Sequence, residues 1–184
     1  MPSYRRNYVP GGTYFFTVVA HLRRPMLTDD LACSCLHQAL DKVRRDWPFD
    51  VFAIVLLPDH FHMVVSLPRG DSNFSLRIRR VKEVFTRNYL DRGGSELSQS
   101  ASRAAHHQRG IWQKRFWEHT IFDENDLKRC VDYIHWNPKK HGLVANVRDW
   151  QWSTFHRFVK AGEYEAHWGA TDPTPGFDTP EWHS

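Results

Sequence analysis

Apolar and polar residues follow one another along the chain in patterns that predict strands and helices. Three short stretches rich in β-branched and aromatic residues, 14–21, 51–57 and 60–67, are typical of strands. Pro58 and Asp59 separate the last two stretches, which predicts a hairpin-like pair. Because both arms of this pair are apolar, we expect them at the centre of a sheet.

Apolar residues at helical spacing predict a helix on either side of this pair. In the first helix Thr28 is the expected cap and the end lies at about Asp46, with charges arranged as the helix dipole favours. The second helix covers 76–91 and directs an apolar face inward. Its other face carries basic residues that can contact either solvent or phosphate: Arg77, Arg79, Arg80, Lys82 and Arg87.

The second half of the chain predicts one more strand and one more helix. Residues 112–122 favour the last strand of the sheet, with basic residues at its start. A helix is expected from Asp123 to Asn137, and Pro138 should end it, because a residue before proline disfavours helical geometry. The region of about 92–110 lacks periodicity and is interpreted as a mobile loop.

The length and composition indicate one soluble globular domain. With 184 residues, 41% of them hydrophobic and 25% charged, the chain can bury a substantial core. We expect a single domain over 1–160 and a poorly ordered tail over 161–184, where Gly, Pro, Asp and Thr are frequent. No targeting segment and no apolar run of membrane-spanning length is visible, so the expected location is the cytoplasm.

The charge of the chain favours a polyanionic partner. The formal net charge is +4, the pI is near 9.1, and eight Trp residues are interleaved with Lys and Arg. Cationic groups for phosphates and aromatic faces for bases are what the binding of single-stranded nucleic acid requires. Aromatic residues also build hydrophobic cores, so both interpretations stay open at this point.

His60 and His62 are the first candidates for chemistry. Successive side chains of a strand alternate between faces, so both imidazoles project from one face while Phe61 points away. Neutral imidazole is the commonest protein ligand of metals, and one divalent metal would use both rings. The alternative is a pair of hydrogen-bonded histidines at the start of a strand.

Tyr133 and Asn137 are the second candidates, because they lie four residues apart on one face of the predicted helix. The amide oxygen of a terminal Asn can turn toward a metal bound by the two histidines. A tyrosine hydroxyl is a weak nucleophile at neutral pH and benefits from a metal that polarises its target. Open positions on such a metal suit a hard octahedral cation. His135 and His141 lie nearby in the sequence, and the residues alone do not identify the general base.

The segments LPDHFHMVVSL and YIHWNPKKHGLV together resemble the single-tyrosine transposases of the His-hydrophobic-His superfamily. More narrowly, RRNYVPGGTYFFT, QKRFWEHTIFDENDL and the form YIHWNP are similar to the REP-associated tyrosine transposases of bacteria. The similarity extends from about Arg5 to Phe158. It implies a single catalytic, DNA-binding domain of the α+β class, with a ferredoxin-like central antiparallel sheet and helices packed on it.

The resemblance also implies roles for the candidate residues. His60, His62 and Asn137 would bind Mg²⁺ or Mn²⁺, and Tyr133 would be the nucleophile. The enzyme would be a DNA strand transferase and endonuclease that cleaves and rejoins palindromic DNA. Attack by the tyrosine would form a 5′-phosphotyrosine and release a 3′-OH, and the covalent ester would conserve the bond for rejoining without ATP.

The implied partner is single-stranded or hairpin DNA, such as a repetitive extragenic palindrome (REP) with a short tetranucleotide at its foot. The arm of residues 5–12 is the candidate reader of that tetranucleotide. No membrane partner is expected, and the sequence leaves open a monomer or a homodimer. The residues expected to contact DNA are Arg5, Arg6, Tyr8, Arg77, Arg79, Arg80, Lys82, Lys114, Arg115, Lys139 and Lys140.

Three other functions remain as alternatives. A replication initiator or relaxase of the same superfamily commonly has a three-histidine cluster, which this sequence does not show. A non-catalytic DNA-binding regulator derived from a transposase would retain Tyr133 for packing only. A zinc hydrolase would need a His-Glu-x-x-His motif or a similar nearby carboxylate, and none accompanies His60 and His62.

Overall fold

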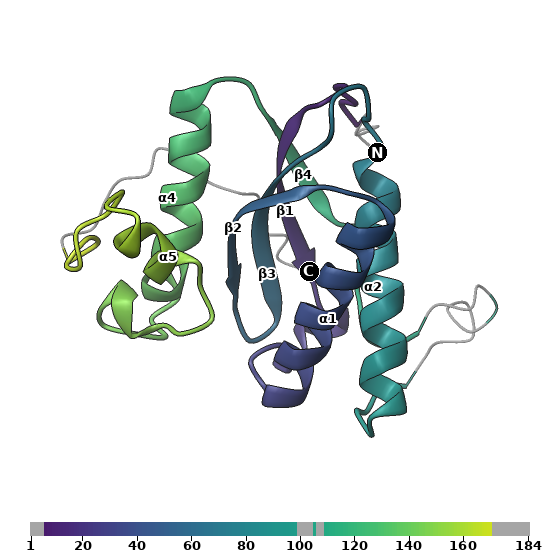
Figure 1. Ribbon diagram of the computed structural model, residues 1–184. Coiled ribbons are helices and arrows are strands. Elements are labelled where there is room, and N and C mark those ends of the chain that lie inside the picture. Colours follow the sequence, from purple (N-terminus) through teal and green to yellow (C-terminus); the bar gives the residue numbers. More distant parts are fainter. Residues whose placement is uncertain (1–5, 99–104, 106–108, 171–184) are drawn as a thin grey trace, which may run out of the picture.

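The computed structural model describes residues 6–98, 105 and 109–170 (Figure 1). Arg5, the centre of the predicted mobile loop and the end of the predicted tail lie outside the described residues. Within these ranges, none of the helices has the length and apolar character needed to cross a membrane.

Four antiparallel strands form one sheet. The strands are β1 (Thr13–Val19), β2 (Asp50–Leu56), β3 (His60–Ser66) and β4 (Trp117–Ile121). They lie in the order β2-β3-β1-β4, with α1 (Asp30–Asp46) between β1 and β2 in the sequence and α2 (Phe74–Asp91) between β3 and β4. This order and these connections are those of a ferredoxin-like fold, so the predicted α+β class and antiparallel sheet are confirmed.

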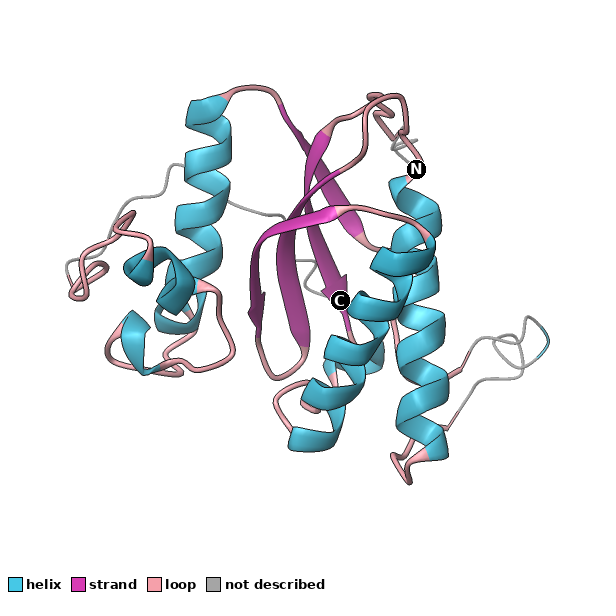
Figure 2. Ribbon diagram, viewed as in Figure 1, coloured by secondary structure: helices cyan, strands magenta, loops and turns pink. Residues whose placement is uncertain are grey.

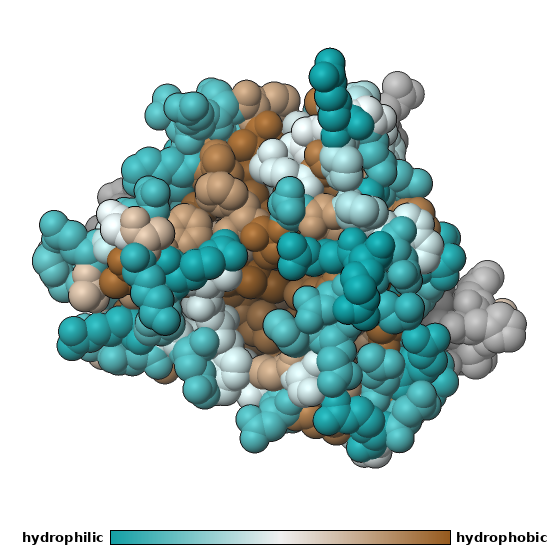
Figure 3. Space-filling model, in the orientation of Figure 1, coloured by the Kyte–Doolittle hydropathy of each residue, from teal (hydrophilic) through white to brown (hydrophobic). Residues whose placement is uncertain are grey.

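Helices cover both faces of the sheet (Figures 1 and 2). α1 and α2 pack side by side on one face, over a core that includes Phe16, Phe61 and Met63. α4 (Glu124–Lys140) packs on the opposite face, over Phe15 and Val64, and α5 (Phe155–Lys160) lies beside it. Figure 3 shows apolar residues gathered over the sheet, between the polar outer surfaces of the helices on either side.

The boundaries that differ from the prediction include the starts of α1 and β4 and the end of α4. α1 begins at Asp30 with Asp29 as its N-cap, one residue after the predicted cap Thr28. β4 begins only at Trp117, because Trp112 forms an isolated bridge at the end of β1. α4 does not end at Asn137.

Pro138 lies inside α4, which continues to Lys140. A proline removes one backbone donor, and this loss is small where only two more helical residues follow. The N–H of His141 donates to the Asn137 carbonyl at 3.0 Å, and the N–H of Gly142 donates to Lys139 at 2.9 Å. Gly142 has a φ of 67°, which ends the helix in the left-handed conformation.

Of the two predicted central strands, β3 is central and β2 lies at the edge of the sheet. β2 is nevertheless apolar, because the segment 152–154 covers its outer edge. The Leu56 N–H donates to the Trp152 carbonyl, and the Thr154 N–H donates to the Ile54 carbonyl, both at 2.9 Å. The cover is partial, because only Ala53 and Val55 of β2 are buried and Phe52 stays exposed.

The described part of the predicted tail, residues 161–170, packs against α4 and α5. The rings of Tyr164 and Trp168 stack with centroids 4.5 Å apart, and Lys139 of α4 donates to the Gly169 carbonyl at 2.8 Å. Residues 171–184 lie outside the described residues. The remaining short elements are the 3-10 helices His21–Arg23 and Val147–Asp149.

Candidate catalytic site

The two histidines lie side by side on the face of the sheet that α4 covers. The ring centroids of His60 and His62 are 4.8 Å apart, and both residues are buried. The Nδ1 atom of His60 is 2.6 Å from the Asp59 carboxylate, and the Nδ1 atom of His62 is 2.9 Å from the Thr17 hydroxyl. Since these contacts hold the Nδ1 side of each ring, the Nε2 nitrogen of each remains to act as a ligand.

The electrostatics of this pair favour neutral imidazole at His62. Burial lowers its pKa well below the usual value, and the neighbouring His60, His141 and Lys140 lower it further. Burial alone would raise the pKa of Asp59, but its hydrogen bond to His60 and the charge of Arg23 lower that pKa to about 2. An ionised carboxylate behind a histidine orients the ring and increases its basicity as a ligand.

A row of residues along α4 faces the histidine pair. Tyr133, Asn137 and His141 are spaced by four residues and therefore lie on one side of the helix. The Tyr133 ring is 5.4 Å from the His62 ring, and the His141 ring is 5.4 Å from the His60 ring. Asn137 lies one turn from each of these residues, between the two contacts, and its amide is buried.

The donor atoms of this cluster fit a metal ion. The Nε2 atom of His62 and both amide atoms of Asn137 are buried, and none has a hydrogen-bond partner among the described residues. An unsatisfied buried polar group costs about 1–3 kcal/mol, so leaving several together is unfavourable without a ligand. Two imidazole nitrogens and one amide oxygen leave coordination positions for phosphate and water on a hard divalent cation.

Tyr133 is 1% exposed and in contact with Lys140. The Lys140 ammonium donates to the tyrosine hydroxyl at 3.3 Å and lies 4.8 Å from the centre of its ring. A DNA phosphate can therefore reach the hydroxyl only after the side chains over it move. Lys140 is half-buried and places a positive charge where the phosphate would arrive.

The structure distinguishes His135 from His141, the two histidines that lie near Tyr133 in the sequence. His135 faces away from the pair, toward α5, where its Nε2 atom is 3.0 Å from the Thr154 hydroxyl and its ring is 4.7 Å from Phe158. Burial lowers the pKa of His135 to about 3, so it is a neutral core residue. His141 lies at the site instead, and the four-residue spacing that pairs Tyr133 with Asn137 could have identified it.

A second group of metal-ligand side chains lies beneath the start of α4. Ligand atoms of His119, Asp126 and Cys130 lie within 4.8 Å of one another. The Asp126 carboxylate already accepts hydrogen bonds from His119 and the Phe122 N–H and pairs with Arg129. Burial raises the pKa of the Cys130 thiol far above its usual value, so it stays protonated. These contacts explain the cluster without a metal.

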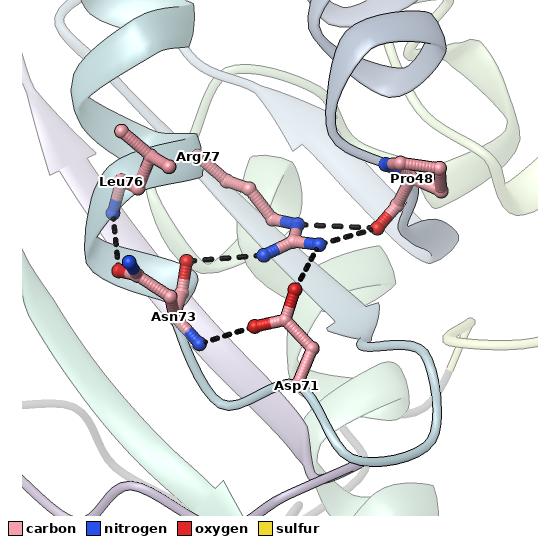
Figure 4. Close-up of polar contacts among 5 residues, drawn as sticks. All are labelled: Pro48, Asp71, Asn73, Leu76 and Arg77. Atoms are coloured by element: carbon pink, nitrogen blue, oxygen red, sulfur yellow. Dashed lines mark hydrogen bonds and ion pairs between the residues drawn. The ribbon is translucent and has the colours of Figure 1, made fainter.

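Arg77 is a correction to the predicted DNA contacts (Figure 4). The residue is 3% exposed, and its side chain is turned into the protein. The guanidinium donates to the Pro48 carbonyl at 2.8 and 3.1 Å, to the Asn73 carbonyl at 3.2 Å and to the Asp71 carboxylate at 2.7 Å. The prediction is therefore wrong for this residue, which fastens the start of α2 to the end of α1.

The other predicted DNA contacts fall on two surfaces and remain predictions. Arg6, Arg79, Lys82 and Lys114 line a hollow beside α2. Tyr8, Arg80 and Arg115 lie close to it: Tyr8 stacks on Phe74 at 4.8 Å, and Arg80 pairs with Glu83 at 2.8 Å. Lys139 and Lys140 lie at the end of α4, on the other side of the sheet.

The family model described as "Transposase IS200 like" matches residues 8–137. This range is more than half of the chain and contains His60, His62, Tyr133 and Asn137. The chain belongs to the IS200-like transposase family. Its membership agrees with the ferredoxin-like sheet and with the position of a tyrosine beside two histidines.

Relatives place this transposase in a narrower group. It is 42% identical over 170 residues to "Putative REP-associated tyrosine transposase" of Haemophilus influenzae, which covers 92% of this chain and 94% of the relative. It is 44% identical over 168 residues to "REP-associated tyrosine transposase" of Escherichia coli, with 91% of each chain covered. The predicted family and the predicted class of enzyme, a tyrosine transposase, are confirmed.

One solved structure is also similar over nearly the whole transposase. Its description is "Structure of the REP associates tyrosine transposase bound to a REP hairpin", and it matches with a TM-score of 0.75 and 41% identity. The match covers 97% of this chain and 99% of the other. The two proteins therefore share the same fold.

Proposed function

We propose that this transposase cleaves and rejoins single-stranded palindromic DNA of the REP hairpin type, through a covalent link to Tyr133. The structural relative described as bound to a REP hairpin supports the choice of DNA. The basic residues beside α2 and at the end of α4 supply charge for its phosphates. The two surfaces lie on opposite sides of the sheet (Figure 1), so a substrate that contacts both must extend beyond one nucleotide.

His60, His62 and Asn137 are the proposed ligands of one Mg²⁺ or Mn²⁺ ion. Such an ion, when bound, polarises the scissile phosphate and neutralises charge that develops on it. Asp59 and Thr17 hold the two imidazoles in the orientation required. The low pKa of His62 keeps this ligand neutral at physiological pH.

Tyr133 is the proposed nucleophile. Its oxygen forms a bond to the phosphorus, the bond from phosphorus to the 3′ oxygen breaks, and the phenolic proton leaves while the 3′ oxygen gains one. Lys140 stabilises negative charge on the tyrosine oxygen through its ammonium group. The product is a 5′-phosphotyrosine with a free 3′-OH, and reversal of this step with a different 3′-OH rejoins DNA.

One observation carries the proposal. The buried Nε2 atom of His62, without a hydrogen-bond partner among the described residues, belongs to the ring that packs against Tyr133. A regulator without catalysis would have no use for this unsatisfied nitrogen or for the unsatisfied amide of Asn137 one turn further along. Both features are expected where metal and nucleophile act on the same phosphate.

The test is cleavage of a hairpin oligonucleotide in Mn²⁺. We expect a denaturation-resistant adduct that carries the fragment 3′ of the cut, and a second fragment whose 3′-OH a polymerase can extend. Tyr133→Phe should bind the DNA and form neither product, and EDTA should abolish both. An adduct in Tyr133→Phe, full activity in EDTA, or an adduct with the opposite fragment would contradict the proposal.

A further inference from the structure

A loop that follows β1, residues 20–27, encloses the turn that leads into His60. The Ala20 N–H donates to the Asp59 carbonyl at 2.8 Å. Two more N–H groups, those of the last two residues of the loop, donate to the Pro58 carbonyl at 2.7 and 2.8 Å. The 20–27 loop therefore fixes the backbone of the turn immediately before the first proposed metal ligand.

Arg23 connects this loop to the side chain of Asp59. The Nη1 atom of Arg23 donates to the Oδ2 atom of Asp59 at 2.9 Å, while the Oδ1 atom of Asp59 accepts from the Nδ1 atom of His60 at 2.6 Å. The Asp59 side chain is 22% exposed, so water competes only in part for these contacts. Because each carboxylate oxygen has its own partner, the guanidinium and the imidazole together fix the plane of the carboxylate. An imidazole held at Nδ1 in this way directs its Nε2 atom toward one position.

The backbone of the loop is unusual at the residues that place this guanidinium. Leu22 and Arg23 have φ values of 53° and 49°, and within the described part of the chain they are the only residues besides glycine with a positive φ. A side chain makes this left-handed conformation unfavourable. Leu22 is 73% exposed, so packing of its side chain does not explain the conformation. Such conformations persist where their surroundings determine them, and they cluster at functional sites.

The sign of the charge distinguishes two roles that Arg23 could have. Its guanidinium is two hydrogen bonds away from the ring of His60 and has the same sign of charge as a metal ion. If Arg23 acted by charge alone, its removal would strengthen metal binding, because a repulsion would be lost. If it acts by holding Asp59, its removal weakens metal binding, because the His60 ring is then less well oriented.

We propose that Arg23 is a positioning residue of the metal site, which holds the Asp59 carboxylate and through it the ring of His60. The left-handed conformation of the 20–27 loop places the guanidinium for this contact. The inference rests on the proposed function, because the role of His60 as a ligand is part of that proposal. It adds a residue that belongs to a different segment of the chain from the proposed ligands and the nucleophile.

The first test measures the affinity of the full chain for Mn²⁺ without DNA, so that no cleavage contributes. The electron paramagnetic resonance signal of free Mn²⁺ gives the dissociation constant. Arg23→Met removes the guanidinium and keeps an unbranched stem, and Arg23→Lys retains the charge. Arg24→Met is the matched control, because the Arg24 guanidinium donates instead to the carbonyl and the hydroxyl of Ser95, at 2.6 and 2.7 Å.

We expect Arg23→Met to bind Mn²⁺ more weakly than the wild type. Loss of a group that orients a ligand lowers metal affinity roughly 10–100-fold, and the lower end, about tenfold, applies where Asp59 itself remains. Arg23→Lys should recover part of this affinity, and Arg24→Met should retain all of it. Unchanged or tighter binding in Arg23→Met, or an equal weakening in Arg24→Met, would overturn the inference.

A double variant tests whether Arg23 acts through Asp59. Asp59→Ala alone should weaken Mn²⁺ binding roughly 10–100-fold. Added to Asp59→Ala, Arg23→Met should weaken binding no further, because the carboxylate that it holds is already absent. Two independent effects would multiply instead, so a further tenfold weakening in the double variant would refute the proposed path.

Two small residues at position 23 separate the backbone from the guanidinium. Glycine adopts a φ of 49° without strain, whereas alanine does not. Arg23→Gly should therefore have a higher Tm than Arg23→Ala, while both bind Mn²⁺ as weakly as Arg23→Met. A return of wild-type Mn²⁺ affinity in Arg23→Gly would assign the effect to the backbone and contradict the role of the side chain.

A measurement without metal examines the same contact directly. In the metal-free protein, the Nδ1 proton of His60 should give a downfield NMR signal that exchanges slowly with water, because the Asp59 carboxylate accepts it. The signal is identified by its absence in His60→Gln. It should broaden or disappear in Arg23→Met and persist in Arg24→Met. An unaltered signal in Arg23→Met would also overturn the inference.

The two proposals fail separately. Loss of Mn²⁺ binding in His62→Ala, together with unchanged binding in Arg23→Met, would refute the role of Arg23 and leave the ligand set intact. A wild type that binds no Mn²⁺, but whose His60 proton signal depends on Arg23, would refute the ligand set and support the hold of Arg23 on His60.

Discussion

Replacement of Lys140 by Met should slow DNA cleavage without a matching loss of binding. The Lys140 ammonium is the group that donates to the Tyr133 hydroxyl, at 3.3 Å. As the tyrosine attacks, negative charge on its oxygen makes this hydrogen bond stronger than it is in the resting enzyme. Removal of the ammonium therefore raises the barrier more than it weakens the complex with DNA.

A hydrogen bond to a charged group contributes about 1.5–3 kcal/mol. The long distance and the half-buried position of Lys140 favour the lower half of that range. Each 1.36 kcal/mol corresponds to a factor of ten, so the single-turnover rate should fall roughly 10- to 40-fold. Lys140→Arg keeps the charge and should recover part of the rate.

Lys139 is the matched control, because it is the same side chain one residue earlier. Its ammonium donates to the Gly169 and Ala170 carbonyls at 2.8 and 3.0 Å. Lys139→Met should therefore retain the cleavage rate. Single-turnover formation of the adduct, with saturating DNA and affinity measured separately, compares the variants. Equal rates in Lys140→Met and wild type, or an equal loss in Lys139→Met, would refute the role of Lys140.

Three other predictions concern stability. Saturating Mn²⁺, at about 100 times its dissociation constant, should raise the unfolding free energy by about 2.7 kcal/mol and Tm by roughly 5–10 °C. His62→Ala should remove this stabilisation, and an equal rise in Tm of the variant would contradict the proposed ligand set. Arg77→Met should lower the unfolding free energy, measured in urea, by about 3 kcal/mol, because it breaks a buried network of hydrogen bonds. Arg79→Met should change the same quantity by less than about 0.5 kcal/mol. Equal losses of stability in the two variants would contradict the role of the buried network. Because burial lowers the pKa of His135 to about 3, the unfolded chain binds a proton below about pH 6.5 that the folded chain does not. His135 should therefore contribute a fall in the unfolding free energy of about 1.4 kcal/mol for each pH unit between about pH 6.5 and about pH 3. A slope in His135→Gln that equals the wild-type slope would contradict this.

The sequence predicted the strands and the face of each histidine well, because period-two alternation maps directly onto a sheet. His60 and His62 face α4, and Phe61 enters the opposite core, as expected from alternation. Tyr133 and Asn137 likewise lie about one helical turn apart on the same side of α4. Local periodicity is enough for these statements, since each concerns neighbours within one element.

Features that depend on contacts between distant segments were not predictable. The sequence showed Arg77 as one of several cations on a helix, and only the approach of Pro48 and Asp71 reveals that it is buried. Pro138 was expected to end its helix, but the bonds that follow it close the end of α4 two residues later. Charge type can be read from sequence, whereas the partner of a charge is set by tertiary packing.

The proposed catalytic residues and most of the cations predicted to contact DNA lie on opposite faces of the sheet. β4 leads into α4, which returns across the sheet on the face opposite α1 and α2 (Figure 1). The proposed metal ligands and Tyr133 therefore lie on one face, while the hollow beside α2, which six Lys and Arg side chains line, lies on the other. The end of β1 is the shortest connection between them, because Val19 pairs with His60 and accepts from Gln113. A DNA strand that contacted both faces would take its most direct path past this end of the sheet.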